Sequence, residues 1–441
     1  MHLTSGTCGR RPASRSTVDW SEIDVGPMMT MNKTARQSAR AHVLLYEPRT
    51  EGHHPAFLKY VTEDLLADGY RLTLAIDLRP EPFERIRAEM TDLLKQVSVI
   101  AVDNTSGGLT GSGKAASVAA CLARAGADLA FLDTFDEIGS AVMRRAAVGL
   151  MPPANLRGRL GGIYHRPRFL DASDRSLKSW IKAVGFGRLL RGGWFSHLLL
   201  VDPYLHEQFK SRHSDAPVFY LPDAYPENFA ADREQARRYF SLPADKRVFL
   251  FYGIPHRRKG LPLAIEAMLA MPADTPAFLI CAGRQPEDAR VAAGVARLTS
   301  QGRACVIDRY VTTQEEKQLF AAADVVLLPY RRHYGGSGVL VRAVGAGVPV
   351  IASDEGLLGR FVRDHSLGLL FRSGDVLTLK SAIEQIARAS ADEMFRWQAA
   401  ARALAPRWSR QAFRDALLGS FHTLSQPFTD EVHSDEATVI G

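Results

Sequence analysis

The stretch that decides the fold is residues 324–360, which read DVVLLPYRRHYGGSGVLVRAVGAGVPVIASDEGLLGR. The apolar run at 325–328 is typical of a strand that is buried on both faces of a parallel sheet. A glycine-rich turn follows at 335–338, and the apolar segment after it ends at Gly347 and Pro349, because glycine caps helices and proline cannot continue them. A second apolar strand comes directly afterwards. The pattern therefore predicts a strand, a glycine turn, a helix and a strand.

This order places the start of the helix at the carboxyl edge of the sheet. A helix start offers unpaired backbone N–H groups and a partial positive charge, which suits a phosphate or a diphosphate. The glycines allow a ligand to approach the backbone closely. On this stretch alone, a plain strand–helix–strand crossover with a glycine turn explains the pattern equally well.

Composition and charge narrow the class of protein. The chain has 441 residues, of which 46% are hydrophobic and 23% charged, enough for two domains with sizeable cores. No run approaches the roughly 18 apolar residues of a membrane span. Four cysteines, which lie far apart, indicate reduced thiols in a cytoplasmic protein rather than a disulfide framework or a zinc site: Cys8, Cys121, Cys281 and Cys305. No secretory signal is visible at the N-terminus.

Apolar strands and amphipathic helices alternate twice along the chain, which predicts two parallel sheets covered on both faces. The expected fold class is α/β, with two tandem Rossmann-like doubly wound domains that face one another across a cleft. The chain divides into six predicted parts: a disordered leader at 1–40, a first domain at 41–228, a linker at 229–246, a second domain at 247–405, a helix at 406–425 that could cross back to the first domain, and a flexible tail at 426–441.

A basic loop at 253–260, GIPHRRKG, follows a predicted buried strand and leads into a helix. Three consecutive cations on an ordinary surface loop would be solvated and would have no binding role. At the carboxyl edge of the second sheet, beside the glycine turn, they instead favour a diphosphate site. A weaker candidate at 108–115 resembles a phosphate loop, but Ala115 stands where the pattern needs Ser or Thr for magnesium, so this segment is expected to be a loop before a helix.

The second half of the chain resembles glycosyltransferase family 4, retaining enzymes of the GT-B fold that transfer a sugar from a nucleotide-diphosphate donor. The matching segments are Gly253 with Lys259-Gly260, 281–283, 319–329, 337–340, Ala343, 347–353 and Gly356. The first half resembles the acceptor domain of this family more loosely, through the loop at 52–54. The resemblance implies that no metal and no cofactor are required beyond the donor itself, and the sequence also lacks an Asp-x-Asp metal motif.

The resemblance implies a donor site with these residues: Gly253, Arg257, Arg258, Lys259, Tyr334, Ser337, Gly338, Val339, Leu340 and Arg342. The family usually carries two glutamates around the glycine turn, where this chain has Tyr334 and Arg342. Ile254 replaces a family arginine, whose charge Arg257 or Arg258 could supply, and Arg360 replaces a further glutamate. Preorganised cations would stabilise the negative charge that develops on the leaving diphosphate.

Candidate catalytic residues in the first half are histidines near predicted strand ends. His165 ends one predicted strand, where the family often places a residue near the sugar, and His53 and His54 lie on the first loop. A strand-end histidine is equally often structural. Asp133 and Asp136 follow another strand and could touch the acceptor or cap a helix.

The net charge of +7 is concentrated in residues 144–195, where eleven Arg or Lys stand against two Asp between Arg144 and Arg191. Aromatic residues lie among these cations, which suits an anionic lipid surface and a lipid-linked acceptor. The alternative is a buried helix with a solvated basic edge. Nucleic acid is not expected as a partner, because no binding module is recognisable.

We therefore expect a hexosyltransferase of GT-B type that moves a sugar from a nucleotide-sugar to a glycan or a lipid-linked acceptor. It would be cytoplasmic, either free or peripheral at the inner membrane. Tyr334 and Arg342 keep a second hypothesis open, a protein that binds a nucleotide-sugar without turnover. A third hypothesis is another enzyme of the same fold, such as an epimerase or a phosphorylase.

Overall fold

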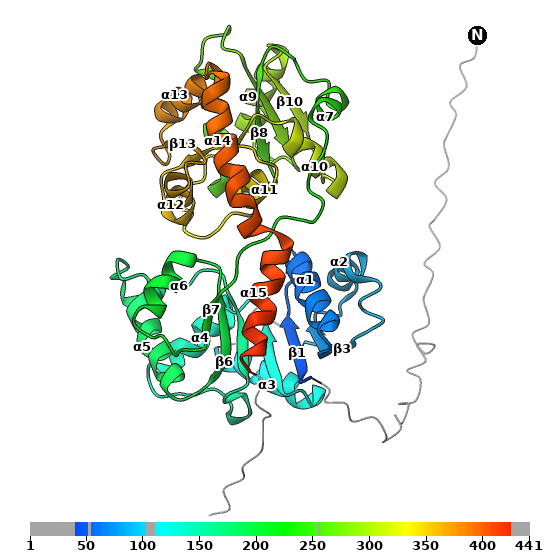
Figure 1. Cartoon of the computed structure of the whole chain (residues 1–441), viewed down its shortest axis with the longest axis vertical. Coiled ribbons are helices and arrows are strands. Elements are labelled where there is room, and N and C mark those ends of the chain that lie inside the picture. The colour runs from blue at the N-terminus through cyan, green and yellow to red at the C-terminus, as the bar shows by residue number, and fades with distance from the viewer. Residues whose placement is uncertain (1–39, 52–53, 103–110, 255, 425–441) are drawn as a thin grey trace, which may run out of the picture. The chain divides into compact units, whose positions relative to one another are not determined.

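Seven parallel strands form the first sheet of the computed structural model, which describes residues 40–51, 54–102, 111–254 and 256–424. Their order in the sheet is β3-β2-β1-β4-β5-β6-β7 (Figure 1). The strands are β1 His42–Glu47, β2 Arg71–Ile76, β3 Ser98–Ala101, β4 Leu129–Leu132, β5 Leu160–Tyr164, β6 Phe195–Leu200 and β7 Val218–Tyr220. Residues 1–39 of the predicted leader, the whole predicted tail and His53 lie outside the described residues.

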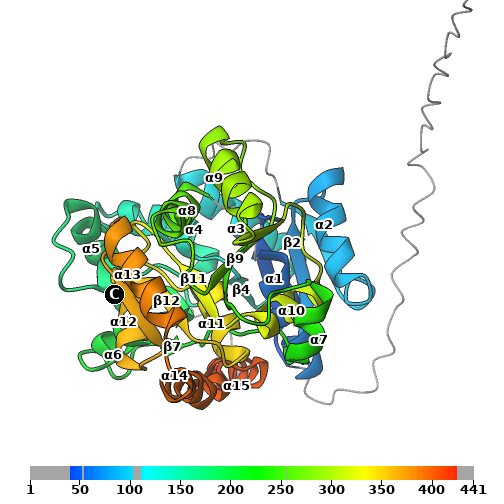
Figure 2. The same ribbon diagram turned by 90° about the horizontal axis from the view of Figure 1, so that it is seen from above.

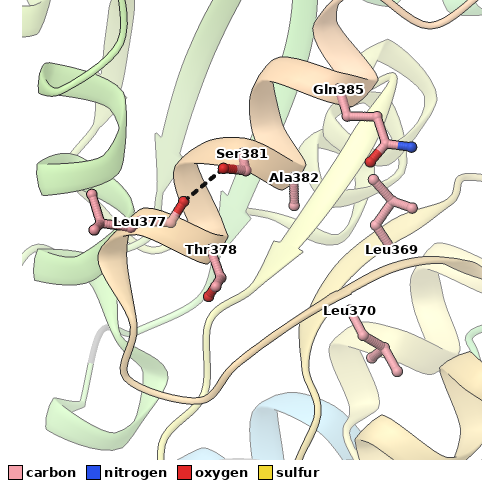
Figure 3. Close-up of a pocket in the computed structure, with 7 residues that line it drawn as sticks. All are labelled: Leu369, Leu370, Leu377, Thr378, Ser381, Ala382 and Gln385. Atoms are coloured by element: carbon pink, nitrogen blue, oxygen red, sulfur yellow. Dashed lines mark hydrogen bonds between the residues drawn. The ribbon is translucent and has the colours of Figure 1, made fainter.

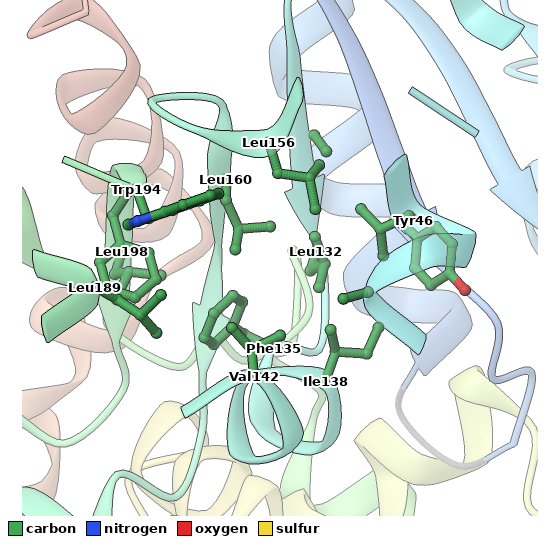
Figure 4. Close-up of a cluster of buried hydrophobic side chains, with 14 of the residues drawn as sticks. Tyr46, Leu132, Phe135, Ile138, Val142, Leu156, Leu160, Leu189, Trp194 and Leu198 are labelled. Atoms are coloured by element: carbon green, nitrogen blue, oxygen red, sulfur yellow. The ribbon is translucent and has the colours of Figure 1, made fainter. Parts of the chain in front are cut away.

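Helices cover both faces of this sheet because successive side chains of a strand point to opposite faces. Leu44 and Tyr46 belong to one hydrophobic cluster, together with residues of α3, α4 and α5 (Figure 4). Val43 and Leu45 belong to the opposite cluster, with residues of α1, α2 and α15. The helices of this domain are α1 His54–Ala67, α2 Pro80–Met90, α3 Gly111–Ala125, α4 Asp136–Ala146, α5 Leu177–Arg191 and α6 Pro203–Lys210.

The second sheet has six parallel strands in the order β10-β9-β8-β11-β12-β13. Val248 and Leu250 of β8 pack toward α10 and α11, whereas Phe249 and Phe251 pack toward α8, α9 and α13. Figure 2 shows α8 and α9 on one side of this sheet and α11 on the other. The strands are β8 Arg247–Tyr252, β9 Ala277–Ala282, β10 Ala304–Ile307, β11 Val325–Leu328, β12 Val350–Ser353 and β13 Gly368–Phe371. The helices are α7 Arg233–Tyr239, α8 Leu261–Leu269, α9 Ala289–Ser300, α10 Thr313–Ala322, α11 Gly338–Gly345, α12 Gly356–Asp364, α13 Val376–Ala387 and α14 Ala391–Leu404.

The last helix, α15 (Arg410–His422), packs against α1, β6 and β7 of the first domain. Both terminal nitrogens of Arg410 donate hydrogen bonds to Asp64 of α1, at 2.7 and 2.8 Å. Helix α14 stays with the second domain, where it contacts α11. The C-terminal helical pair thus contributes to both domains (Figure 1).

Each sheet has one place where the strand order reverses. In the first sheet β1 and β4 are neighbours, and in the second sheet β8 and β11 are neighbours. Crossover helices leave such a pair in opposite directions, so a crevice opens outside the carboxyl ends of the two strands, and ligands of doubly wound sheets bind there. These two switch points therefore locate the candidate sites.

The predicted fold class of two tandem doubly wound domains is confirmed. One local prediction is wrong in part. Helix α3 begins at Gly111, so residues 111–114 of the predicted loop are helical, and 108–110 lie outside the described residues. Across the described part of the chain, no helix combines the length and the apolar character that crossing a membrane would require.

Candidate functional site

The basic loop after β8 brings Lys259 back over the end of its own strand. A Cβ atom at Gly253 would lie 2.6 Å from Nζ of Lys259, so this ammonium group lies directly over the end of β8, and the φ of 96° at Gly253 favours glycine there. Gly260 adopts φ 73°, and a Cβ atom there would collide with the carbonyl oxygen of Pro329. The loop is thereby pressed against the segment after β11, and Lys259 lies at the switch point between β8 and β11.

The surroundings of Lys259 disfavour its charged form. Burial, followed by the charges of Arg258 and Arg342, lowers the pKa of Lys259 to about 8. An ammonium group in such surroundings gains more from an anion than a solvated lysine does, because the anion relieves both the desolvation and the repulsion. The site is therefore preorganised for negative charge.

Arg258 is fixed by His333 of the glycine turn. Nη1 of Arg258 lies 3.3 Å from Nδ1 of His333, and Nε2 of His333 lies 2.9 Å from the carbonyl oxygen of Gly336. This arrangement requires a neutral imidazole with its proton on Nε2, so that Nδ1 can accept from the guanidinium group. Burial and nearby cations lower the pKa of His333 to about 4, which is consistent with the neutral form.

Helix α11 starts at the other side of the same switch point. Oγ of Ser337 accepts a hydrogen bond from the backbone N–H of Leu340 at 3.3 Å and so caps the helix. The side chains of Val339 and Leu340 are buried in the core, so these two predicted donor residues can offer a ligand only backbone groups. The N–H groups of the first turn have no partner within an α-helix and suit a phosphate.

Arg342 folds back onto the start of α11. Its Nη1 donates to the carbonyl oxygen of Gly338 at 3.1 Å, and its Nε donates to Oε1 of Glu316 at 2.6 Å. Glu316 belongs to α10, and its charge and hydrogen bond, after burial, raise the pKa of Tyr252 at the end of β8. The guanidinium group is thus held at the helix start by a carboxylate that the sequence analysis did not identify.

Two other predicted donor residues lie differently. Arg257 is exposed, whereas Tyr334 is half exposed and carries the guanidinium group of Arg168 at 4.1 Å from its ring centre. Arg166 also reaches this turn, since its Cγ lies 3.5 Å from where a Cβ of Gly335 would be. Basic residues of the first domain therefore contact the glycine turn of the second.

A polar cluster occupies the switch point of the first sheet. His54 begins α1, and its Nδ1 lies 3.2 Å from Oε2 of Glu47 and 3.0 Å from Oγ1 of Thr134. The hydroxyl group of Thr134 also donates to Oε2 of Glu47 at 2.7 Å. Glu47 ends β1 and is fully buried, and the sequence signal that could have revealed it is a charge at the end of an apolar strand.

His165 follows the neighbouring strand β5 but has different contacts. Its backbone N–H donates to Oδ2 of Asp136 at 2.8 Å, and its ring packs edge-on against Phe57 of α1, with 5.4 Å between ring centres. Asp136 therefore ties the end of β5 to the start of α4. The predicted histidines His54 and His165 both lie near carboxyl ends of strands, whereas His53 lies outside the described residues.

The cavity drawn in Figure 3 lies elsewhere, between β13 at the edge of the second sheet and α13. Its volume is about 290 Å³, and its lining residues are Leu369, Leu370, Leu377, Thr378, Ser381, Ala382 and Gln385. These side chains include no charged group, and the only hydrogen bond drawn among them runs within α13, from Oγ of Ser381 to the carbonyl oxygen of Leu377 at 3.0 Å. The convergent charges lie at the β8/β11 switch point instead.

The second domain is similar to a known protein family. Residues 246–389, which contain the whole β8/β11 switch point, match the family model described as glycosyl transferases group 1. The D-inositol 3-phosphate glycosyltransferase of Mycolicibacterium paratuberculosis is 30% identical over 206 residues, 45% of each chain. The lipopolysaccharide core biosynthesis glycosyltransferase LpsE of Rhizobium meliloti is 29% identical over 185 residues, 41% of this chain and 52% of that protein. The chain spans about half the length of these curated relatives.

Solved structures resemble nearly the whole described chain. Anabaena HepE in complex with UDP and glucose superposes with a TM-score of 0.61 at 17% identity, covering 87% of this chain and 100% of that chain. WaaG, a glycosyltransferase involved in lipopolysaccharide biosynthesis, superposes with a TM-score of 0.60 at 15% identity, covering 88% of this chain and 100% of that chain. With its two doubly wound domains, this chain has the GT-B fold.

Proposed function

We propose that the protein is a glycosyltransferase that moves a hexosyl group from a nucleotide-diphosphate sugar to an acceptor. The observation that carries the proposal is the convergence of Lys259, Arg258 and Arg342 on the start of α11 at the β8/β11 switch point. The match of residues 246–389 to glycosyl transferases group 1, and the complexes of Anabaena HepE with UDP and with UDP-glucose, support a nucleotide-sugar as the donor.

The positive charges at this switch point suit the departure of a diphosphate leaving group. When the bond between the sugar and the diphosphate breaks, positive charge develops on the sugar carbon and negative charge on the leaving diphosphate. Lys259 and Arg342 would stabilise the leaving group together with the N–H groups at the start of α11, and their arrangement before reaction avoids a reorganisation cost. Arg258, which His333 holds in place, would add a third positive charge.

The proposed reaction retains the configuration of the sugar and needs no metal ion. Both features come from the resemblance to retaining GT-B enzymes. Proton NMR of the fresh product tests retention, because the anomeric coupling of the product should match that of the donor. Equal rates with and without a chelator would support metal independence.

A second candidate function is binding of a nucleotide-sugar without turnover. Tyr334 and Arg342, which stand where the resembled family has glutamates, favour it. Binding and turnover measured across a panel of UDP-, GDP-, ADP- and TDP-sugars separate the two functions. Hydrolysis or transfer with at least one donor supports the enzyme, whereas tight binding without turnover of any donor supports the second function.

The acceptor is proposed to be a glycan or a lipid-linked glycan, reached at an anionic membrane surface. Helix α5 supports this proposal because Leu177 and Trp180 are 69% and 63% exposed beside the cations Arg175 and Lys178, while Phe186 points into the core. Apolar side chains among cations favour the interface of an anionic bilayer. The protein would then work in the cytoplasm, at the inner face of the membrane.

Vesicle sedimentation tests the membrane surface. The chain should sediment with phosphatidylglycerol vesicles more than with phosphatidylcholine vesicles, and a Leu177→Ala, Trp180→Ala double variant should sediment less with phosphatidylglycerol vesicles than the wild type does. Phe395→Ala is the matched control, since Phe395 is also exposed, at 62%, but lies on α14. Equal sedimentation of the double variant and the wild type would contradict the surface.

A further inference from the structure

Two carboxyl groups meet at the switch point of the first sheet. Tyr46 of β1 pairs with Leu132 of β4, so the next residues along the two strands, Glu47 and Asp133, are neighbours. Paired residues of adjacent parallel strands project to the same side, with backbones about 4.8 Å apart. Both side chains are buried, with 0% of Glu47 and 1% of Asp133 exposed.

The two carboxyl groups differ in their partners. Glu47 accepts hydrogen bonds from the backbone N–H of Arg49 at 2.8 Å and from Thr134 at 2.7 Å. Neither carboxyl oxygen of Asp133 has a hydrogen-bond partner among the described residues. A buried polar group without a partner is costly, and such groups cluster at functional sites.

The pair is not arranged to receive an anion. Burial, and then the charge of Glu47, raises the pKa of Asp133, which favours its protonated form. The nearby cations Arg49 and Lys114 both form ion pairs with Glu137 of α4, so their charges are compensated. This switch point is therefore acidic, in contrast to the basic switch point of the second domain.

We propose that Glu47, Asp133, Thr134 and His54 form the acceptor site of the first domain, and that this site takes the ring hydroxyl groups of an uncharged polyol rather than a phosphate group. The inference rests on the proposed function, because it names the chemical class of the group that receives the sugar. Thr134 is half-buried and offers the contact. Glu47 accepts from the Thr134 hydroxyl group and so acts through it as a positioning residue, and Asp133 places a second buried carboxyl group beside Glu47.

The hydrogen-bonding capacity of the proposed acceptor site fits ligands that carry hydroxyl groups. The hydroxyl group of Thr134 donates its one proton to Glu47, so toward a ligand its oxygen can only accept. A ring hydroxyl group can donate to it, whereas an ionised phosphate oxygen cannot. A phosphate group would instead face the charge of Glu47, with a repulsion that costs affinity. The site should consequently discriminate by charge among acceptors of the same ring shape.

Binding of three probes to the full chain, saturated with UDP, tests the proposal. Saturation-transfer NMR titrations would compare myo-inositol, D-glucose and D-inositol 3-phosphate. At least one of the two uncharged polyols should bind at least about tenfold more tightly than D-inositol 3-phosphate. Glu47→Gln should reduce this discrimination, which a merely structural role of Glu47 would not do.

Matched variants isolate the Thr134 hydroxyl group. Thr134→Val removes the hydroxyl at nearly the same volume and should weaken polyol binding about tenfold, whereas Thr134→Ser keeps the hydroxyl and should bind like the wild type. Asp77→Asn is the control, because Asp77 is a buried carboxylate at the end of the adjacent strand β2 but is paired with Arg79. It should leave polyol binding unchanged.

Three results would overturn the inference: tighter binding of D-inositol 3-phosphate, no binding of either uncharged polyol, or equal polyol binding by folded Thr134→Val and wild type. UDP affinity, measured by calorimetry on the same variants, separates this failure from failure of the donor site. Normal UDP binding with any of the three results contradicts only the acceptor site, whereas absence of UDP binding contradicts the proposed function.

Discussion

Arg342 and Glu316 form a 2.6 Å hydrogen-bonded ion pair between α11 and α10, at the position where the resemblance leads one to expect a glutamate. The ion pair does not use all of the hydrogen-bond donors of Arg342. Nη1 of Arg342 still reaches the carbonyl oxygen of Gly338 at the start of α11. A positive charge has thus replaced a carboxylate beside the predicted diphosphate, and Glu316 fixes its place.

Arg342→Ala should weaken the binding of UDP about 10- to 100-fold, because a charged hydrogen bond to the diphosphate is lost. Glu316→Gln should weaken it less, since the arginine keeps its charge and loses only its anchor. Calorimetric titration with UDP measures both effects. A Glu316→Gln variant that binds more weakly than Arg342→Ala would show that the carboxylate itself contacts the ligand.

The pKa of Lys259 predicts a pH dependence. Its value of about 8 in the free protein should rise when an anion binds, so binding takes up a proton above that pH. UDP affinity should be full below about pH 8 and should fall by up to about tenfold per unit above it. Titrations from about pH 7, where the phosphates of UDP are already ionised, to about pH 9.5 measure the slope. The slope should vanish in Lys259→Arg, and a slope that persists there would assign the titration to another group.

The packing of the Lys259 loop can be tested through Gly260. Gly260→Ala should lower the free energy of unfolding by about 2–4 kcal/mol, because the new methyl group would strike the carbonyl oxygen of Pro329 in addition to straining the backbone. Gly69→Ala is the control, since Gly69 also has a positive φ, 85°, but has no atom within 4 Å of its would-be Cβ. It should cost only about 1 kcal/mol. Equal costs in urea unfolding would contradict the close approach.

The anchor of the last helix gives a further prediction. Arg410 and Asp64 are 7% and 2% exposed, so Arg410→Met should leave a buried carboxylate unpaired and cost about 3–5 kcal/mol in urea unfolding. Arg414→Met, on the same helix, should cost less than about 1 kcal/mol, because the Arg414 side chain is 41% exposed and lies 3.9 Å from Asp64. Similar costs for both variants would indicate that the contact of α15 with α1 does not depend on this ion pair.

The sequence contains most of the information about the fold because periodicity reports on local structure. The apolar runs that became β8 and β11, and the glycine turn before α11, place Lys259 and Ser337 at one sheet edge without any knowledge of tertiary contacts. Chain direction and strand order then determine which loops meet. That the basic loop and the start of α11 meet at one sheet edge could therefore be predicted in advance.

Side-chain contacts between residues far apart in the sequence could not be predicted in the same way. Glu316 lies 26 positions before Arg342, and only the packing of α10 against the sheet brings the two together. Glu47 and Asp133 are 86 positions apart and become neighbours through the pairing of β1 with β4. The inward side chains of Val339 and Leu340 likewise depend on how α11 is rotated against its sheet.

The most direct measurement of the central claim is the affinity of UDP for Lys259→Ala and Arg257→Ala, two variants of the same basic loop. Lys259 lies at the switch point over Gly253, whereas Arg257 is exposed to solvent. The account predicts that Lys259→Ala loses about 10- to 100-fold in affinity and that Arg257→Ala binds like the wild type. Undiminished binding by a folded Lys259→Ala variant would contradict the assignment of the β8/β11 switch point as the donor site.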